Sequence, residues 1–292
     1  MRIARSAKKN ALPLRESKPP GAAFSRTLFD KLLEIAKALK NFDAKLSRGE
    51  VHRLRVATRR LRAIFEVLAE DPPPGLKPKA QRSVKFLTNQ LGEIRSLDVS
   101  LKLWRTRFSL PFVEPELKNR ARRARRRMGK KVGKKDRAVL SQALQKILSQ
   151  LRRGPENYRR AWEKRRELAE RRAWRCYSTY RAKDDIETLH ELRIRFKQWR
   201  YLLELTPAQS TQRRKIELLK VLQDDIGELH DMEVLCGLLK KDRIKRVAQK
   251  EKAGHDLKEI RRGLEAEIEA GQKSFLARQS QALAQIFPKE KA

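Results

Sequence analysis

The chain has 292 residues and carries 72 Lys and Arg against 36 Asp and Glu, which gives a net charge of +36 at pH 7. This excess is far larger than solubility requires and indicates a polyanionic partner, a class that includes DNA, RNA, acidic membrane surfaces and inorganic polyphosphate. No apolar run reaches the roughly 18 residues of a membrane span, and the basic N-terminus lacks the apolar core of a secretory signal. We therefore expect a cytoplasmic protein without a membrane span.

The first 21 residues are basic, contain Pro19 and Pro20 and show no apolar periodicity, which predicts a flexible arm over residues 1–21. From residue 22 onward, apolar residues recur at three- and four-residue steps among Ala, Leu, Glu, Lys and Arg. This pattern predicts an all-α fold without strands. Cys176 and Cys236 lie within such patterns and lack metal-ligand spacing, so we expect reduced core thiols.

The first distinctive helix reads VHRLRVATRRLR from Val51, and Ser47 with Glu50 predicts a capping box at its start. At about 100° per residue, four basic side chains share an arc of about 80° beside an apolar arc. These side chains are His52, Arg55, Arg59 and Arg62. A basic stripe next to a buried stripe is typical of a rigid anion-binding surface.

Two further segments follow in the first half of the chain. The stretch LGEIRSLDV begins at Leu91 and places Arg95 three residues before Asp98. Residues 118–137, KNRARRARRRMGKKVGKKDR, are strongly basic, and their like charges oppose helix formation in isolation. We expect this basic connector to extend an anion-binding surface, with a solvated helix as the alternative.

Both motifs then recur. LHELRIRFKQWR from Leu189 repeats the first helix, with Asp185 in the N-cap position, and IGELHDMEV from Ile226 repeats the second segment. The repeated basic residues are His190, Arg193, Lys197 and Arg200, and His230 stands where the first copy has Arg95. The chain is therefore predicted to contain two tandem helical repeats, residues 22–150 and 151–292, each of four helices.

The four segments, in this order, resemble those of CHAD domains, conserved histidine α-helical domains whose members bind inorganic polyphosphate. The resemblance covers nearly the whole chain from about residue 22. It implies that the two repeats are four-helix bundles, related by a pseudo-two-fold axis, that together form one CHAD domain. It also implies that both basic stripes face a central basic channel, where polyphosphate is bound. We expect the protein to associate with polyphosphate granules.

Carried over position by position, the resemblance implies ten polyphosphate contacts. They are His52, Arg55, Arg59, Arg62, Arg95, His190, Arg193, Lys197, Arg200 and His230. Three acidic residues, Asp98, Asp231 and Glu233, would orient neighbouring cations through charge-assisted hydrogen bonds, and ordinary ion pairs within a helix, such as Arg95 with Asp98, are an equal alternative. The chain departs from the family pattern at Ser96, where Asp is usual, and at Gln198, where a cation is common.

The sequence gives no indication of an enzyme, a metal or a cofactor. It contains no GxxxxGK[ST] phosphate loop, no GxSxG motif and no acidic cluster for magnesium. Glu187 and His190 have the E-x-x-H spacing of di-iron bundles, but the first copy has no counterpart and the basic surroundings would repel a cation. We therefore expect a binding protein rather than an enzyme.

The alternative function is nonspecific binding of nucleic acid. A charge of +36 predicts weak binding of DNA or RNA at low salt. Single-strand binders usually expose aromatic side chains on which bases stack, whereas Phe65, Phe196 and Trp199 fall on the predicted buried arcs. The sequence therefore favours polyphosphate over nucleic acid.

Overall fold

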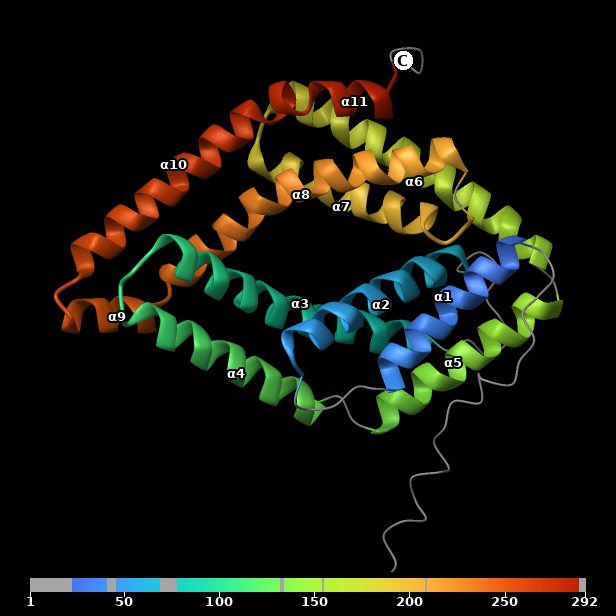
Figure 1. The fold of residues 1–292 in the computed structure, drawn as a ribbon, viewed down its shortest axis with the longest axis horizontal. Coiled ribbons are helices and arrows are strands. Elements are labelled where there is room, and N and C mark those ends of the chain that lie inside the picture. The colour runs from blue at the N-terminus through green and yellow to red at the C-terminus, as the bar shows by residue number, and fades with distance from the viewer. Residues whose placement is uncertain are drawn as a thin grey trace, which may run out of the picture. The chain divides into compact units, whose positions relative to one another are not determined.

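The computed structural model describes residues 23–40, 46–68, 78–131, 134–153, 155–207 and 209–288. These ranges contain eleven helices and no strand, which confirms the predicted all-α class (Figure 1). The predicted arm over residues 1–21 lies outside them. None of these helices is both long and apolar enough to cross a membrane.

The helices differ widely in length. In chain order they are α1 (Ala23–Lys40), α2 (Arg48–Val67), α3 (Pro78–Arg107), α4 (Val113–Lys131), α5 (Lys134–Arg153), α6 (Pro155–Lys183), α7 (Ile186–Leu203), α8 (Ser210–Leu239), α9 (Asp242–Lys250), α10 (Gly254–Arg278) and α11 (Ser280–Ile286).

The two helices that carry the histidine motifs begin where the sequence predicts. Ser47 and Glu50 form a capping box on α2: Ser47 Oγ accepts from the Glu50 amide at 3.2 Å, and the Ser47 amide donates to Glu50 Oε2 at 2.7 Å. On α7, Asp185 Oδ1 accepts from the Thr188 amide at 2.7 Å. Both predicted N-caps are therefore confirmed, and each satisfies a backbone donor that the helix leaves free.

The described residues form two compact units, each built from segments that are distant in sequence. Unit 1 comprises the described residues within 23–91, 128–163 and 205–207, and unit 2 those within 92–127, 164–204 and 209–288. The helices α3, α4 and α6 thus contribute residues to both units. Compactness does not test internal duplication, so the repeats over 22–150 and 151–292, their bundles and their symmetry stay predictions.

Unit 1 is centred on α1, which packs against both α2 and α5. The residues between these helices are fully buried and apolar, and they include Leu32, Ile35, Leu61 and Ile64. At the edge of this core, Arg60 Nη1 donates to Glu34 Oε2 at 2.7 Å and joins α2 to α1. The apolar arc predicted for α2 is therefore buried, which fixes the rotation of this helix about its axis.

Unit 2 is organised around α8, against which α7, α10 and α11 pack. One apolar cluster joins α6, α7, α8, α10 and α11 and contains Phe196, Trp199 and Phe275, all without solvent exposure. A second cluster joins the C-terminal half of α3 to α4, α9, α10 and the end of α8, around Trp104. The long helices α8 and α10 belong to both clusters and connect them.

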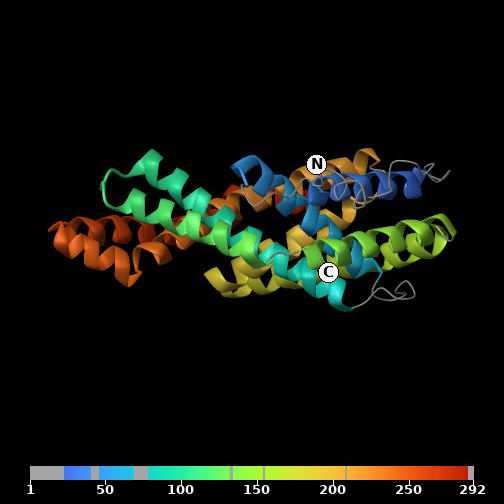
Figure 2. The same ribbon diagram turned by 90° about the horizontal axis from the view of Figure 1, so that it is seen from below.

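The basic connector is helical through Lys131, the last residue of α4. In both views α4 runs beside the C-terminal half of α3 (Figures 1 and 2). Arg125 Nη2 donates to both carboxylate oxygens of Asp98 at 2.7 and 2.8 Å, and Arg127 pairs with Glu93. These carboxylates and the burial of Leu117, Ala121, Ala124 and Met128 offset the repulsion expected among the like charges.

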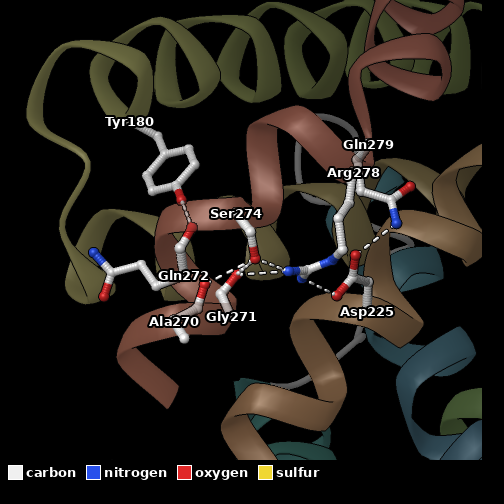
Figure 3. A network of polar contacts seen from close by, with 8 residues as sticks. All are labelled: Tyr180, Asp225, Ala270, Gly271, Gln272, Ser274, Arg278 and Gln279. Atoms are coloured by element: carbon white, nitrogen blue, oxygen red, sulfur yellow. Dashed lines mark hydrogen bonds and ion pairs between the residues drawn. The ribbon is translucent and has the colours of Figure 1, made fainter. Parts of the chain in front are cut away.

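The C-terminal end of α10 is fixed to α8 and α6 by a polar network (Figure 3). Arg278 Nη2 donates to Asp225 Oδ1 on α8 at 2.8 Å, and its Nη1 donates to the carbonyl oxygen of Gly271 at 3.1 Å. The Tyr180 hydroxyl on α6 donates to the carbonyl oxygen of Gln272 at 3.1 Å. Together these bonds hold α10 in its place on α8.

α10 lies close against α8 at Gly271, because a Cβ atom there would overlap the Leu229 side chain. We expect Gly271→Ala to lower the free energy of unfolding by about 1–3 kcal/mol. Gly263 lies on the same helix with open space beside it. The control variant Gly263→Ala should therefore be neutral or stabilising by about 0.5–1 kcal/mol. Urea denaturation followed by circular dichroism measures both, and equal effects would contradict the proposed close packing.

Candidate anion-binding site

A stripe of four cationic or imidazole side chains follows one side of α7. His190, Arg193, Lys197 and Arg200 are all half-buried. The neighbouring side of the helix, formed by Leu189, Leu192, Phe196 and Trp199, has no solvent exposure. Because the apolar side chains fix the rotation of α7, the polar ones stand at the border between core and solvent.

Arg193 reaches across from α7 to the backbone of α8. A Cβ atom at Gly227 would lie 3.6 Å from Arg193 Nη2 and 3.9 Å from its Nε, so the guanidinium rests against the glycine. Gly227 is the glycine of the repeated G-E-L segment. Because glycine has no side chain, it leaves room for the guanidinium, and this explains why a glycine suits this position of the motif.

Two histidines and one carboxylate meet between α7 and α8. The ring centroids of His190 and His230 are 4.6 Å apart, with 49° between the ring planes. His230 Nδ1 lies 3.2 Å from Glu233 Oε2, one helical turn further along α8. The structure thus brings together His190, Arg193, His230 and Glu233, the first and last of which are 43 residues apart in the sequence.

The surroundings of His190 disfavour its protonated form. Burial is the main cause of its lowered pKa, and the nearby His230 and Arg193 charges lower the pKa further, while Glu233 acts in the opposite direction. At a given pH, a larger fraction of His190 is therefore neutral than of a free histidine side chain. A phosphate group placed here would relieve the positive charge that surrounds the ring.

Arg200, at the end of the stripe, has an internal acidic partner. Its Nη1 lies 3.3 Å from Glu204 Oε1, and both side chains are less than one-fifth exposed. The guanidinium carbon also stands 5.0 Å from the centre of the Tyr201 ring. This cation is therefore more firmly held than a solvated arginine.

The corresponding stripe of unit 1 lies on α2. Arg55, Arg59 and Arg62 are half-buried and His52 is exposed. Val51, Leu54, Thr58, Leu61 and Phe65 are buried on the adjacent side. Arg95, the remaining predicted contact, lies on α3 in unit 2 and is exposed.

The predicted supporting acids differ in what they contact. Buried Asp98 accepts two hydrogen bonds from Arg125 on α4, and Glu233 contacts His230. Asp231 is half-buried on α8.

The sequence analysis predicted neither the role of Arg125 nor the contact of Arg193 with Gly227. Arg125 lies between Ala124 and Met128 near the buried side of α4, and this position could have indicated a partly buried cation. Its partner Asp98 is on another helix and is determined by tertiary packing.

Comparison with known proteins gives two findings. A family model of the CHAD domain matches residues 31–240. The crystal structure of the CHAD domain from the plant Ricinus communis superimposes with a TM-score of 0.60 at 17% sequence identity, covering 90% of this chain and 89% of that one. A search of curated proteins gives no match.

The lowered pKa of His190 predicts a stability loss in acid. Since the unfolded chain has the ordinary pKa of 6.5, it takes up a proton first as the pH falls, and stability declines from that point downward. We expect the free energy of unfolding of His190→Gln to fall less steeply below pH 6.5 than that of the wild type. His255 has a side chain that is 82% exposed, so His255→Gln should keep the wild-type slope. Parallel slopes in all three proteins would contradict the assignment.

Proposed function

The chain belongs to the CHAD domain family, and on that premise we propose that it binds inorganic polyphosphate through the basic stripes of α2 and α7. The observation that supports the proposal most directly is how the side chains of the α7 stripe are positioned. Its side chains stand on a helix whose neighbouring side is fully buried, with Arg193 against Gly227 and His190 beside His230. Donors held in this way lose little freedom when they bind phosphate oxygens.

We propose binding without turnover. The side chains gathered on α7 and α8 can donate hydrogen bonds and neutralise charge, which is what retention of a polyanion requires. Phosphoryl transfer generally needs a phosphate loop with bound magnesium, or comparable positioning of a nucleophile, and no such motif occurs in the sequence. Association with cytoplasmic polyphosphate granules is part of the same proposal.

Polyphosphate is favoured over nucleic acid by the placement of the aromatic residues. Phe65, Phe196 and Trp199 are buried, and none of the described aromatic side chains is fully exposed. Stacking of bases on exposed rings is therefore not supported, whereas a chain of phosphates needs only cations and hydrogen-bond donors. Binding of DNA or RNA through charge alone is expected to be weak and to occur at low salt.

Because many phosphates are neutralised at once, affinity for long-chain polyphosphate should fall steeply as salt rises. Orthophosphate and ATP, with far fewer charges, should bind much more weakly. Fluorescence anisotropy across a salt series measures the slope. A competition with duplex DNA near physiological salt should leave polyphosphate bound, and displacement by equimolar DNA would support the nucleic-acid function instead.

A pair of matched double variants separates a built site from bulk charge. Replacing Arg55 and Arg193 by Ala removes two half-buried cations from the stripes, whereas replacing Arg122 and Arg126 by Ala removes two exposed cations from α4. Loss of a hydrogen bond to a charged group costs about 1.5–3 kcal/mol, so the first pair should weaken polyphosphate binding by roughly tenfold to a hundredfold or more. The second pair should weaken it only slightly.

The comparison is valid only between folded proteins, so helix content and melting temperature are measured for each variant. Equal losses of affinity in the two double variants would mean that the total charge, rather than the stripes, binds the anion.

A further inference from the structure

Gln223 on α8 carries a buried amide group whose nitrogen has no hydrogen-bond acceptor. The residue is 4% exposed. Its Nε2 atom is buried and finds no partner among the residues that the structure describes. An amide donor buried without a partner costs free energy, and nearly all buried polar groups in proteins have one. A donor left in this state therefore points to an acceptor that comes from outside the chain.

Helix geometry places Gln223 on the side of α8 that faces α7. Four residues turn a helix by about 400°, so the side-chain directions at positions 223 and 227 differ by only about 40°. Gly227 faces the Arg193 guanidinium of α7. His230, about one turn further along α8, lies beside His190. Gln223 is thus in line with the two residues of α8 that contact the α7 stripe.

The register between the two helices gives the amide its neighbours on the stripe. The two contacts just described advance along α7 while they go back along α8, so the helices are antiparallel. One more turn brings Lys197 to the level of Gln223, and Arg200 follows one turn beyond. The Nε atom of Arg200 is also buried without an acceptor among the described residues, although its Nη1 pairs with Glu204. Two unsatisfied donors therefore stand at this end of the stripe.

The first copy of the motif fills the equivalent position without an unsatisfied donor. Gln223 stands three residues before the segment IGELHDMEV, and Thr88 stands three residues before LGEIRSLDV. Thr88 is also buried, but its hydroxyl donates to the carbonyl oxygen of Val84 at 2.7 Å. A polar residue buried here can thus be satisfied within its own helix, so the fold does not require the unsatisfied amide of Gln223.

We propose that the Gln223 amide donates a hydrogen bond to an oxygen of the anion bound along the α7 stripe. This assignment rests on the proposed function, because it adds a contact to the same ligand. Rotation about the last side-chain bond can turn the amide nitrogen toward the ligand while α8 stays in place. A neutral donor suits this position, because it contacts a phosphate oxygen without adding to the repulsion among the cations of the stripe.

The test replaces Gln223 by Met in the full chain, which removes the donor and keeps an unbranched side chain of similar length. With long-chain polyphosphate as the probe, we expect the Kd to rise about tenfold at every salt concentration, the loss typical of a hydrogen bond to a charged acceptor. The slope of log Kd against log salt should keep its wild-type value, because no cation is removed. Arg193→Ala should instead make this slope shallower.

Thermal denaturation followed by circular dichroism gives a second readout. Removal of an unsatisfied buried donor removes its cost, so Gln223→Met should melt at the wild-type temperature or above it. The matched control is Gln212→Met, also on α8. Gln212 Nε2 donates to the carbonyl oxygen of Leu203 at 2.7 Å, so this variant should melt at a lower temperature and bind polyphosphate as the wild type does.

Three results would overturn the assignment. The first is wild-type affinity of Gln223→Met for polyphosphate. The second is a melting temperature of this variant below that of the wild type, which would mean that the amide already has a partner such as a buried water. The third is a shallower salt slope, which would mean that the amide only positions the cations.

The proposed function survives any of these results if the wild type binds polyphosphate and the double variant of Arg55 and Arg193 loses affinity. A wild type that binds no polyphosphate would overturn the function and the role of Gln223 together.

Discussion

Burial of the apolar sides of α2 and α7 is the constraint on which the rest of the molecule depends. A chain with 72 cationic residues repels itself, and only packing of apolar surface can hold so many like charges in a folded state. Phe196 and Trp199 on α7, and Leu61 and Ile64 on α2, are completely or almost completely buried. The same packing that stabilises each unit therefore also sets where its cations stand.

Several carboxylates act as counter-ions between helices. Asp98 and Glu93 pair with arginines of α4, and Glu34 pairs with Arg60 of α2. Of these pairs, Asp98 with Arg125 is the one in which the acid is almost fully buried, and leaving that carboxylate without its partner would be costly. In these pairs an acidic side chain joins two helices that each carry an excess of cations.

The helices, both N-caps and the border position of the motif cations could be predicted from sequence because they depend on spacing within single helices. Ser47 with Glu50 and Asp185 with Thr188 are pairs three residues apart. The contacts of Arg193 with Gly227 and of His190 with His230 join different helices, and helix periodicity carries no information on such distances. The repeat did align Arg95 with His230, but it could not show that His230 has a second imidazole beside it.

The ion pair between Arg200 and Glu204 would make the proposed anion binding at the end of the α7 stripe a competition with an internal carboxylate. An incoming anion meets a guanidinium whose Nη1 already lies 3.3 Å from a carboxylate, so it must share Arg200 with Glu204 or displace that carboxylate. Displacement is favourable only for a ligand whose local charge density exceeds that of one carboxylate, because the displaced Glu204 must be rehydrated or moved. A carboxylate inside the stripe would therefore favour densely charged anions over weakly charged solutes at this end of α7.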